Sequence, residues 1–201
     1  MSSVQPIFQS IFAEQWAHLP PVMYKHYSNR PYCDDVVTVE GTMDVEFGWL
    51  VRLLSPLLRL FGALVPYQGN DIPVTVHFRS EPDSIAFCLD RRFTFSDNRS
   101  YIFYSRMMPV KNNIIIEFMK YGIGWKHEFS YDGDKVLLKH CGYVWEIFGK
   151  MIPVPLGLLV GRGYAEESAL SEDSFKMKMC ITHPLFGKMY EYRGQFEVRD
   201  E

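Results

Sequence analysis

The sequence lacks the features that mark a chain as something other than a folded domain. Its 201 residues include 14 glycines and 12 prolines, ordinary counts that exclude a collagen-like or linker-like chain. Hydrophobic residues make up 47%, which excludes intrinsic disorder. No repeat, low-complexity tract or charged linker divides the chain, so we expect a single domain over residues 1–201.

An excess of positive charge is also missing. The chain has 21 Lys and Arg against 24 Asp and Glu, a formal net charge of -3, and no long basic run. Nucleic-acid binders carry a basic face that neutralises phosphates, so general nucleic-acid binding is excluded as a working hypothesis. A chain of this length can bury a large core without a metal or disulfide staple.

Cysteine and histidine are few and widely spaced. The four cysteines form no CxxC pair and the six histidines no HxH or HExxH pattern, which argues against a metal site and a disulfide framework. The first residues, MSSVQPIFQSIFAEQW, do not resemble a signal peptide, so we expect free thiols in the cytoplasm. There is no GxGxxG or GxSxG motif; we expect no cofactor, and no catalytic residue is assigned.

Aromatic residues are plentiful, and most alternate with polar ones after Gly69. Alternation with period two predicts β-strands, with Asp132-Gly133 as a hairpin turn. One strand-like run, 36–45, precedes Gly69. The others are 74–79, 85–95, 101–108, 114–119, 125–131, 136–145, 175–182 and 190–198. Their short connections leave no room for the helical crossovers of a parallel sheet. We therefore predict an α+β fold: a curled antiparallel sheet of about eight to ten strands, a barrel or half-barrel.

Two helical segments are expected before these strands. Apolar residues at spacings of three and four predict a helix over residues 7–18, which Pro20-Pro21 ends, with a short helical turn following over 21–27. The segment 47–66 is the most apolar in the chain and has helical length, with a polar stripe and Pro56, which would kink or divide it. We expect it to pack across the concave face of the sheet or cap a cavity, with docking on a membrane surface as the alternative. Two arginines and Pro56 argue against a transmembrane span.

The segment 151–163, MIPVPLGLLVGRG, is the second apolar feature. Pro153 and Pro155 are incompatible with a regular central strand or helix, so the segment is interpreted as an apolar loop. We expect it to be buried as a crossover against the sheet; a lid beside the first helix is the alternative.

One arginine falls on the apolar side of its predicted strand. Arg91 shares its parity with Phe87, Leu89 and Phe93, so it should point into the apolar face. A buried arginine needs a carboxylate or an anionic ligand. Glu117 and the pair Glu166-Glu167 could supply a carboxylate, and the structural ion pair and the ligand anchor both remain open.

Seven segments together resemble a bacterial family described as a domain of unknown function. In order along about 180 residues they are LPPVMYKHY, WLVRLLSPLLRLFGALVP, DIPVTVHF, DRRF, IEFMKYG, IPVPLGLL with EE following, and HPLFGKMYEYRGQF. Members of this family often follow a saccharopine-dehydrogenase-like, NAD(P)-dependent reductase domain in one polypeptide. These 201 residues contain no such domain, so an accessory role to a reductase would need a separate chain. The resemblance implies shared motif positions at Arg91, Arg92, Glu117, Pro153, Pro155, Glu167, Tyr192, Arg193 and Gly194.

Three functions remain open. The first is a module that binds a lipid-like or amphipathic small molecule in an apolar cavity, with ligand-binding residues Arg91, Glu117, Glu167, Tyr192 and Arg193. Arg193 is the weaker member, because its parity opposes the rings of its own strand. The second is an accessory domain that docks on a reductase or a membrane surface. The third is an enzyme of unknown reaction; we expect binding rather than catalysis.

Overall fold

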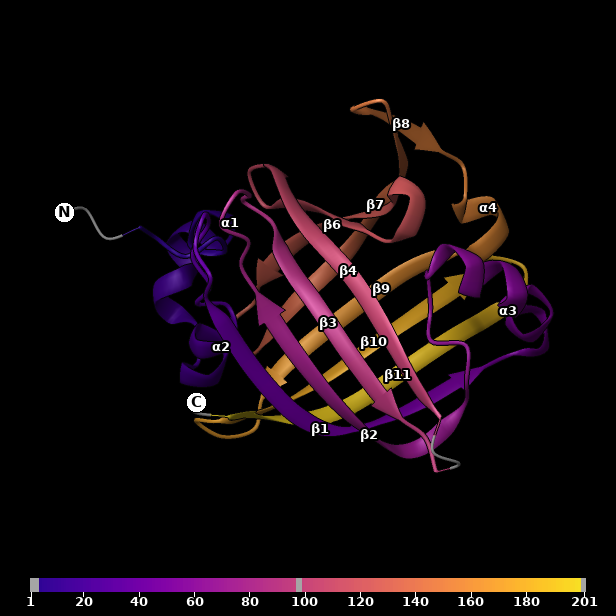
Figure 1. The fold of residues 1–201 in the computed structure, drawn as a ribbon, viewed down its shortest axis with the longest axis horizontal. Helices are drawn as coiled ribbons and strands as arrows, with labels where there is room; N and C mark the ends of the chain where they lie inside the picture. The colour runs from indigo at the N-terminus through magenta and orange to yellow at the C-terminus, as the bar shows by residue number, and fades with distance from the viewer. Residues whose placement is uncertain (1–3, 97–98, 200–201) are drawn as a thin grey trace.

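The chain forms a β-barrel, seen side-on in Figure 1. A computed structural model describes residues 4–96 and 99–199. Within these residues, ten antiparallel strands close into a ring in the order β6-β5-β4-β3-β2-β1-β11-β10-β9-β7, and pairing of β6 with β7 completes it. An eleventh strand, β8, pairs with β7 outside the ring. The predicted antiparallel fold is confirmed, and of its two forms it is the barrel.

The strands follow the alternation seen in the sequence, with apolar side chains pointing inward. Their bounds are β1 Val36–Phe47, β2 Gly69–Arg79, β3 Phe87–Thr94, β4 Ser100–Lys111, β5 Ile114–Phe118, β6 Ile123–Tyr131, β7 Lys135–Ile147, β8 Lys150–Val154, β9 Arg162–Ala169, β10 Ser174–His183 and β11 Gly187–Arg199. The predicted hairpin joins β6 to β7, where Oδ1 of Asp132 accepts the backbone N–H groups of Asp134 and Lys135. Gly133 in that turn has φ +101°, which a glycine adopts without strain.

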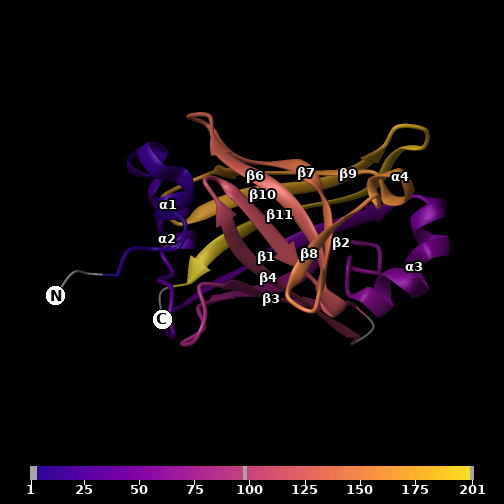
Figure 2. The same ribbon diagram turned by 90° about the horizontal axis from the view of Figure 1, so that it is seen from above.

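The N-terminal helices close one end of the barrel. They are α1 (Gln9–Phe12), a 3₁₀ segment η1 (Ala13–His18) and α2 (Pro21–His26). The helix predicted over 7–18 is therefore not one regular α-helix: Ala13 has φ 49°, which interrupts it. Its apolar face is nevertheless buried, and the rings of Phe8 and Phe12 pack against Phe129 of the barrel wall. Figure 2 shows α1 and α2 at one end and α3 and α4 at the other.

The predicted helix over 47–66 is α3 (Trp49–Phe61), which lies at the opposite end of the barrel. Pro56 neither ends nor divides it. Among its thirteen residues only Val51 is fully buried, while Leu50 and Leu58 pack on the edge of the core. The helix therefore caps the barrel end instead of packing deep across the sheet.

The segment 151–163 differs from the prediction. It is not a loop but the edge strand β8 followed by the one-turn helix α4 (Gly157–Val160). Pro153 is tolerated because it lies on an edge strand, where a missing N–H breaks no ladder. The expected burial against the sheet is wrong: Met151, Ile152 and Leu158 are exposed.

Candidate functional site in the barrel interior

Two adjoining cavities occupy the barrel. The outer one, of about 170 Å³, lies under α3 and α4 and is lined almost entirely by apolar side chains. The inner one, of about 60 Å³, lies deeper and contains charged side chains from several strands. Glu117, Trp125 and Tyr192 line both cavities, so these three residues mark the place where an apolar space meets a polar one.

Arg91 and Glu117 form a buried ion pair on the inner side of the barrel wall. Arg91 lies on β3 and Glu117 on β5, and Nη2 of Arg91 donates to Oε1 of Glu117 at 2.7 Å. Ser105, on the intervening strand β4, donates to the same oxygen at 2.5 Å. Burial alone would raise the pKa of Glu117, but Arg91, His127 and Ser105 outweigh it and the pKa is lowered. Both groups are therefore charged at neutral pH, and the structural ion pair left open by the sequence is present.

Arg91 nevertheless keeps one donor unused. Its Nη1 is buried and has no hydrogen-bond partner in the described part of the chain. Its guanidinium carbon lies 4.5 Å from the centre of the Phe103 ring, a contact that fixes its plane. Because the side chain lines the inner cavity, an acceptor placed there would complete its hydrogen bonding.

Glu167 is the second carboxylate of the inner cavity. It lies on β9 and accepts a hydrogen bond from Oη of Tyr27 at 2.6 Å, while Nε2 of His26 lies 3.4 Å from the same oxygen. Burial raises the pKa of Glu167 to about 7 against the lowering effects of Tyr27 and Arg91. Burial also lowers the pKa of His26 to about 3, so this histidine is neutral. Glu167 is thus the group at this site that changes its charge near neutral pH.

Two further polar groups lie in the barrel interior. His127 on β6 is fully buried, and burial lowers its pKa to about 4 although Glu117 works in the opposite direction. Its Nδ1 lies 3.1 Å from the backbone oxygen of Trp125. Tyr192 on β11 lies near Arg91, Glu117 and Glu167, and burial raises its pKa to about 12, so its hydroxyl stays protonated.

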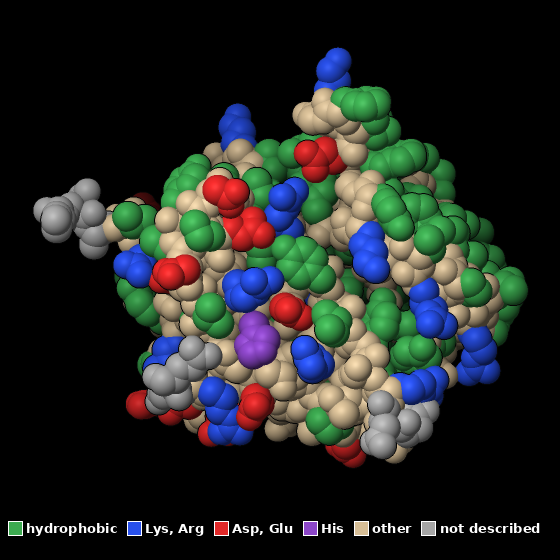
Figure 3. Space-filling view, viewed as in Figure 1, with side chains coloured by type: hydrophobic (Ala, Val, Ile, Leu, Met, Phe, Trp, Pro, Cys, Tyr) green, Lys and Arg blue, Asp and Glu red, His purple; other side chains and the backbone are tan. Residues whose placement is uncertain are grey.

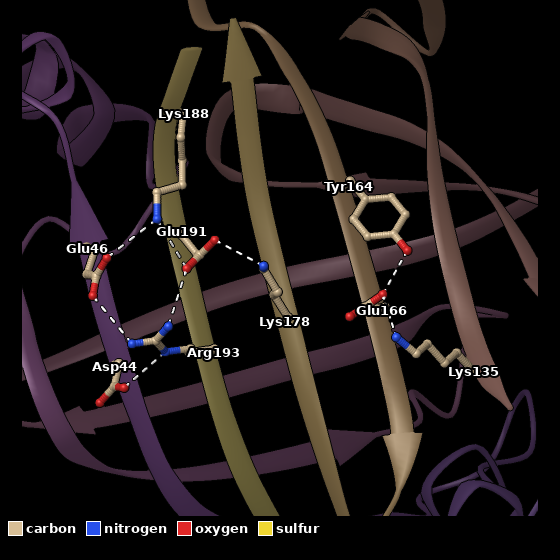
Figure 4. A network of polar contacts seen from close by, with 9 residues as sticks. All are labelled: Asp44, Glu46, Lys135, Tyr164, Glu166, Lys178, Lys188, Glu191 and Arg193. Carbon is tan, nitrogen blue, oxygen red and sulfur yellow. Dashed lines mark hydrogen bonds and ion pairs between the residues drawn. The ribbon is translucent and has the colours of Figure 1, made fainter.

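The structure brings Arg91, Glu117, Glu167 and Tyr192 together and separates Arg193 from them. The alternation of β11 that turns Tyr192 inward turns Arg193 outward. Figure 4 shows Arg193 in an outer network, where it contacts Asp44 at 3.2 Å, Glu46 at 3.6 Å and Glu191 at 3.8 Å. Its inclusion among the residues of an interior ligand site therefore does not fit the geometry.

Four residues of the interior site were missed at the sequence level. Ser105 and His127 had a usable signal, because each shares the parity of its apolar neighbours on its strand, Phe103 and Met107 for Ser105, Trp125 and Phe129 for His127. His26 and Tyr27 had none, because a helix supplies them from outside the sheet. Strand β9, which carries Glu167, was also missed, since its Gly163, Ala165 and Glu167 do not read as an apolar face.

No group of three His, Cys, Asp or Glu side chains suited to a metal ion occurs in residues 4–96 and 99–199. Nor does any helix in those ranges have both the length and the apolar content needed to cross a membrane.

The fold and interior define a closed antiparallel β-barrel with a polar cluster beneath an apolar mouth. The chain belongs to the family described as "Domain of unknown function (DUF4166)", whose model matches residues 19–196. The family resemblance is thereby confirmed, whereas fusion to a reductase is not tested by this match. Among curated proteins, none matches the sequence significantly.

Two solved structures show a distant likeness. The crystal structure of Rv2717c from M. tuberculosis has a TM-score of 0.44 at 10% identity, covering 81% of this chain and 91% of that one. The dehydratase domain of the polyketide PpsC from Mycobacterium tuberculosis has a TM-score of 0.20 at 5% identity, covering 94% and 84%. Neither likeness is strong enough to carry an argument about this chain.

Proposed function

We propose that the protein is a binding module for an amphipathic small molecule with an anionic or hydrogen-bond-accepting end. The apolar part occupies the outer cavity under α3 and α4, and the polar end reaches the inner cavity. The observation that carries the proposal is the buried, unpartnered Nη1 of Arg91, a side chain that lines the inner cavity and pairs with Glu117, which lines both cavities. Leaving such a donor unsatisfied costs stability, and a bound acceptor removes that cost.

The charges around Arg91 favour this orientation of the ligand. Arg91 and Glu117 cancel each other, and Glu167 is partly protonated near neutral pH. A carboxylate end placed near Arg91 therefore meets a cation without a fixed excess of negative charge. A cationic end in the same place would offer no acceptor to the unpartnered Nη1 of Arg91, which can only donate.

Dodecanoate is a suitable probe, because it joins one apolar chain to one carboxylate. Calorimetry should detect its binding to the wild-type protein, and dodecyltrimethylammonium, which has the same chain and a cationic end, should bind much more weakly. The double variant Arg91→Met/Glu117→Gln removes both partners, so that neither is left charged alone. We expect it to lose about tenfold to a hundredfold in affinity for dodecanoate.

Arg193→Met is the matched control, since it makes the same change on the outer face. It should bind dodecanoate as the wild type does. Native mass spectrometry of protein purified from cells is the complementary measurement and should reveal a co-purifying small molecule. If wild type binds no dodecanoate and carries no small molecule, or if the double variant binds as well as the wild type, the proposal fails.

A second function, an accessory domain that docks on another surface, is favoured by a different observation. The end of the barrel at α3 and α4 exposes many large apolar side chains. In this proposal the partner is a membrane or a separate reductase chain, and the charges at that end distinguish the two.

A further inference from the structure

We propose that the end of the barrel covered by α3 and α4 docks on the surface of an anionic lipid bilayer. The docking surface, called here the mouth face, consists of residues 48–68, 119–123, 148–163 and 183–189. They include α3, the turn before β6, the β7–β8 turn with strand β8 and helix α4, and the β10–β11 turn. This proposal does not depend on the ligand proposed above.

The mouth face exposes an unusual amount of apolar surface. Of the 21 large hydrophobic side chains that are exposed among the described residues, 12 lie on it. The most exposed are Phe148 at 100%, Leu185 at 83%, Leu158 at 82% and Trp49 at 69%. Figure 3 shows hydrophobic side chains gathered along the edge of the molecule where β8, α4 and α3 lie. Contiguous apolar patches on soluble proteins mark interaction sites.

Helix α3 illustrates why this surface suits a bilayer. Leu50, Val51 and Leu58 face the barrel. On the other side, Trp49, Leu53, Leu57 and Leu60 are exposed at spacings of four, four and three, which forms a second apolar stripe toward solvent. A helix that is apolar on both sides is expected to be buried on both sides. The barrel covers only one side of α3, and the other side faces solvent. Exposed Trp and Leu next to arginines are typical of helices that lie at a lipid interface.

Charge identifies the partner as an anionic surface. The mouth face contains six of the 21 Lys and Arg residues and none of the 24 Asp and Glu residues. The rest of the chain therefore has 15 basic and 24 acidic residues. All six are exposed: Arg52, Arg59, Lys120, Lys150, Arg162 and Lys188. Lys188 contacts Glu46 and Glu191 at the border of the face. The mouth face of a protein of net charge -3 is thus basic, with Glu46, Glu146 and Glu191 at its border. Basic residues beside apolar ones bind acidic lipid headgroups.

The four segments form one surface because they contact each other. The rings of Phe61 and Tyr121 lie 5.9 Å apart. Nε2 of His183 lies 3.0 Å from the backbone oxygen of Leu158, and the backbone N–H of Gly48 donates to the oxygen of Met189 at 3.0 Å. Leu57, Leu159 and Val160 also line the outer cavity, so docking would place the cavity mouth against the lipid.

Vesicle flotation tests the proposal. Wild-type protein should float with vesicles of equal parts phosphatidylcholine and phosphatidylserine, less at high salt, and much less with pure phosphatidylcholine. Phe148→Ser/Leu158→Ser removes exposed apolar groups and Arg52→Glu/Lys150→Glu reverses two charges. Each pair should weaken binding to the mixed vesicles by about tenfold or more.

Matched controls use exposed residues away from the mouth face. Ile102→Ser/Val110→Ser and Lys139→Glu/Lys176→Glu should float as the wild type does. Arg91→Met/Glu117→Gln should also float normally even if dodecanoate no longer binds, which separates this test from that of the proposed function.

Three outcomes would overturn the proposal. They are no flotation of the wild type with mixed vesicles, an equal loss of binding in the control pairs and the mouth-face pairs, and flotation that is indifferent to phosphatidylserine. If sedimentation velocity instead shows a dimer that Phe148→Ser/Leu158→Ser dissociates, without flotation, the mouth face is an interface between two copies of the chain. If neither is seen and a separate reductase chain binds it, the partner is a protein.

Discussion

Single buried residues set the chemistry of the barrel interior. Arg91 and Glu117 stabilise each other's charged forms, whereas Glu167 has no cation in direct contact and is held by Tyr27 and His26. This difference in partners explains why the two carboxylates behave oppositely: the pKa of Glu117 is lowered, and the pKa of Glu167 is raised to about 7.

The raised pKa of Glu167 predicts a pH dependence of stability. The ordinary pKa is 4.5, so between pH 4.5 and 7 the folded protein holds a proton that the unfolded chain releases. The free energy of unfolding contributed by this group is fully present below that window and is lost as the pH rises through 7. At about 1.4 kcal/mol per pKa unit, the loss is roughly 3 kcal/mol.

Glu167→Gln isolates this contribution, because glutamine still accepts from Tyr27 but does not titrate. Urea denaturation at about pH 5 and about pH 8 should show the variant gaining roughly 3 kcal/mol relative to wild type at the higher pH. His26 and His127 have lowered pKa values and act in the opposite sense, but they are common to both proteins. An equal difference between the two proteins at both pH values would contradict the assignment.

At the scale of elements, the β7–β8 turn combines strain with exposure. Phe148 and Gly149 both have positive φ, 48° and 73°, and they join Ile147 to Lys150 as a two-residue hairpin loop. Such a loop favours Asn-Gly, because asparagine tolerates this conformation and a bulky side chain does not. A fully exposed phenylalanine gains nothing from packing here, so folding does not explain its place, and the proposed docking would.

Phe148→Asn should therefore stabilise the folded protein by about 0.5–1 kcal/mol while weakening flotation with anionic vesicles. Thermal unfolding and flotation on the same preparation measure the two effects. Phe186→Asn, on the exposed β10–β11 turn without positive φ, is the comparison and should weaken flotation without stabilising. Loss of stability in Phe148→Asn would mean that the ring has a packing role.

At the scale of the whole molecule, the two ends of the barrel are built differently. One is plugged by aromatic rings: Phe8 is fully buried and its ring lies 4.9 Å from that of Phe87 and 5.2 Å from that of Phe129. The other end is capped loosely by α3 and α4, over the outer cavity. In the proposed function, the ligand would therefore enter the barrel at the end covered by α3 and α4.

This asymmetry predicts unequal effects of truncation at the two ends. Phe8→Ala should lower the free energy of unfolding by about 3–5 kcal/mol, since it leaves a cavity in a packed cluster. Leu158→Ala on the mouth face should change it by less than about 0.5 kcal/mol. Urea denaturation of both variants measures the free energy of unfolding. Equal effects would show that the mouth face also belongs to the hydrophobic core.

Much of the architecture follows from local pattern. The alternation along β3, β4, β6 and β11 predicted strands and the side chains that share a face, whatever the final shape of the sheet. The short connections between these strands then predicted an antiparallel sheet. The inward position of Arg91 and the outward one of Arg193 follow from the alternation. Strand β9 was missed because glycine, alanine and glutamate on its inner face carry little hydrophobic signal.

Other properties depend on contacts between residues far apart in the chain. Closure of the barrel needs β6 to pair with β7 and β7 with β9, and no local pattern specifies that ring. The hydrogen bond from Tyr27 to Glu167 joins residues 140 positions apart. Only the tertiary structure buries Glu167, and this burial raises its pKa to about 7 although Tyr27 and Arg91 lower it. Segment 151–163 likewise looked like buried chain from its composition. A hydrophobic sequence indicates that a segment is more stable away from water. Only the tertiary structure decides whether other parts of the protein bury it.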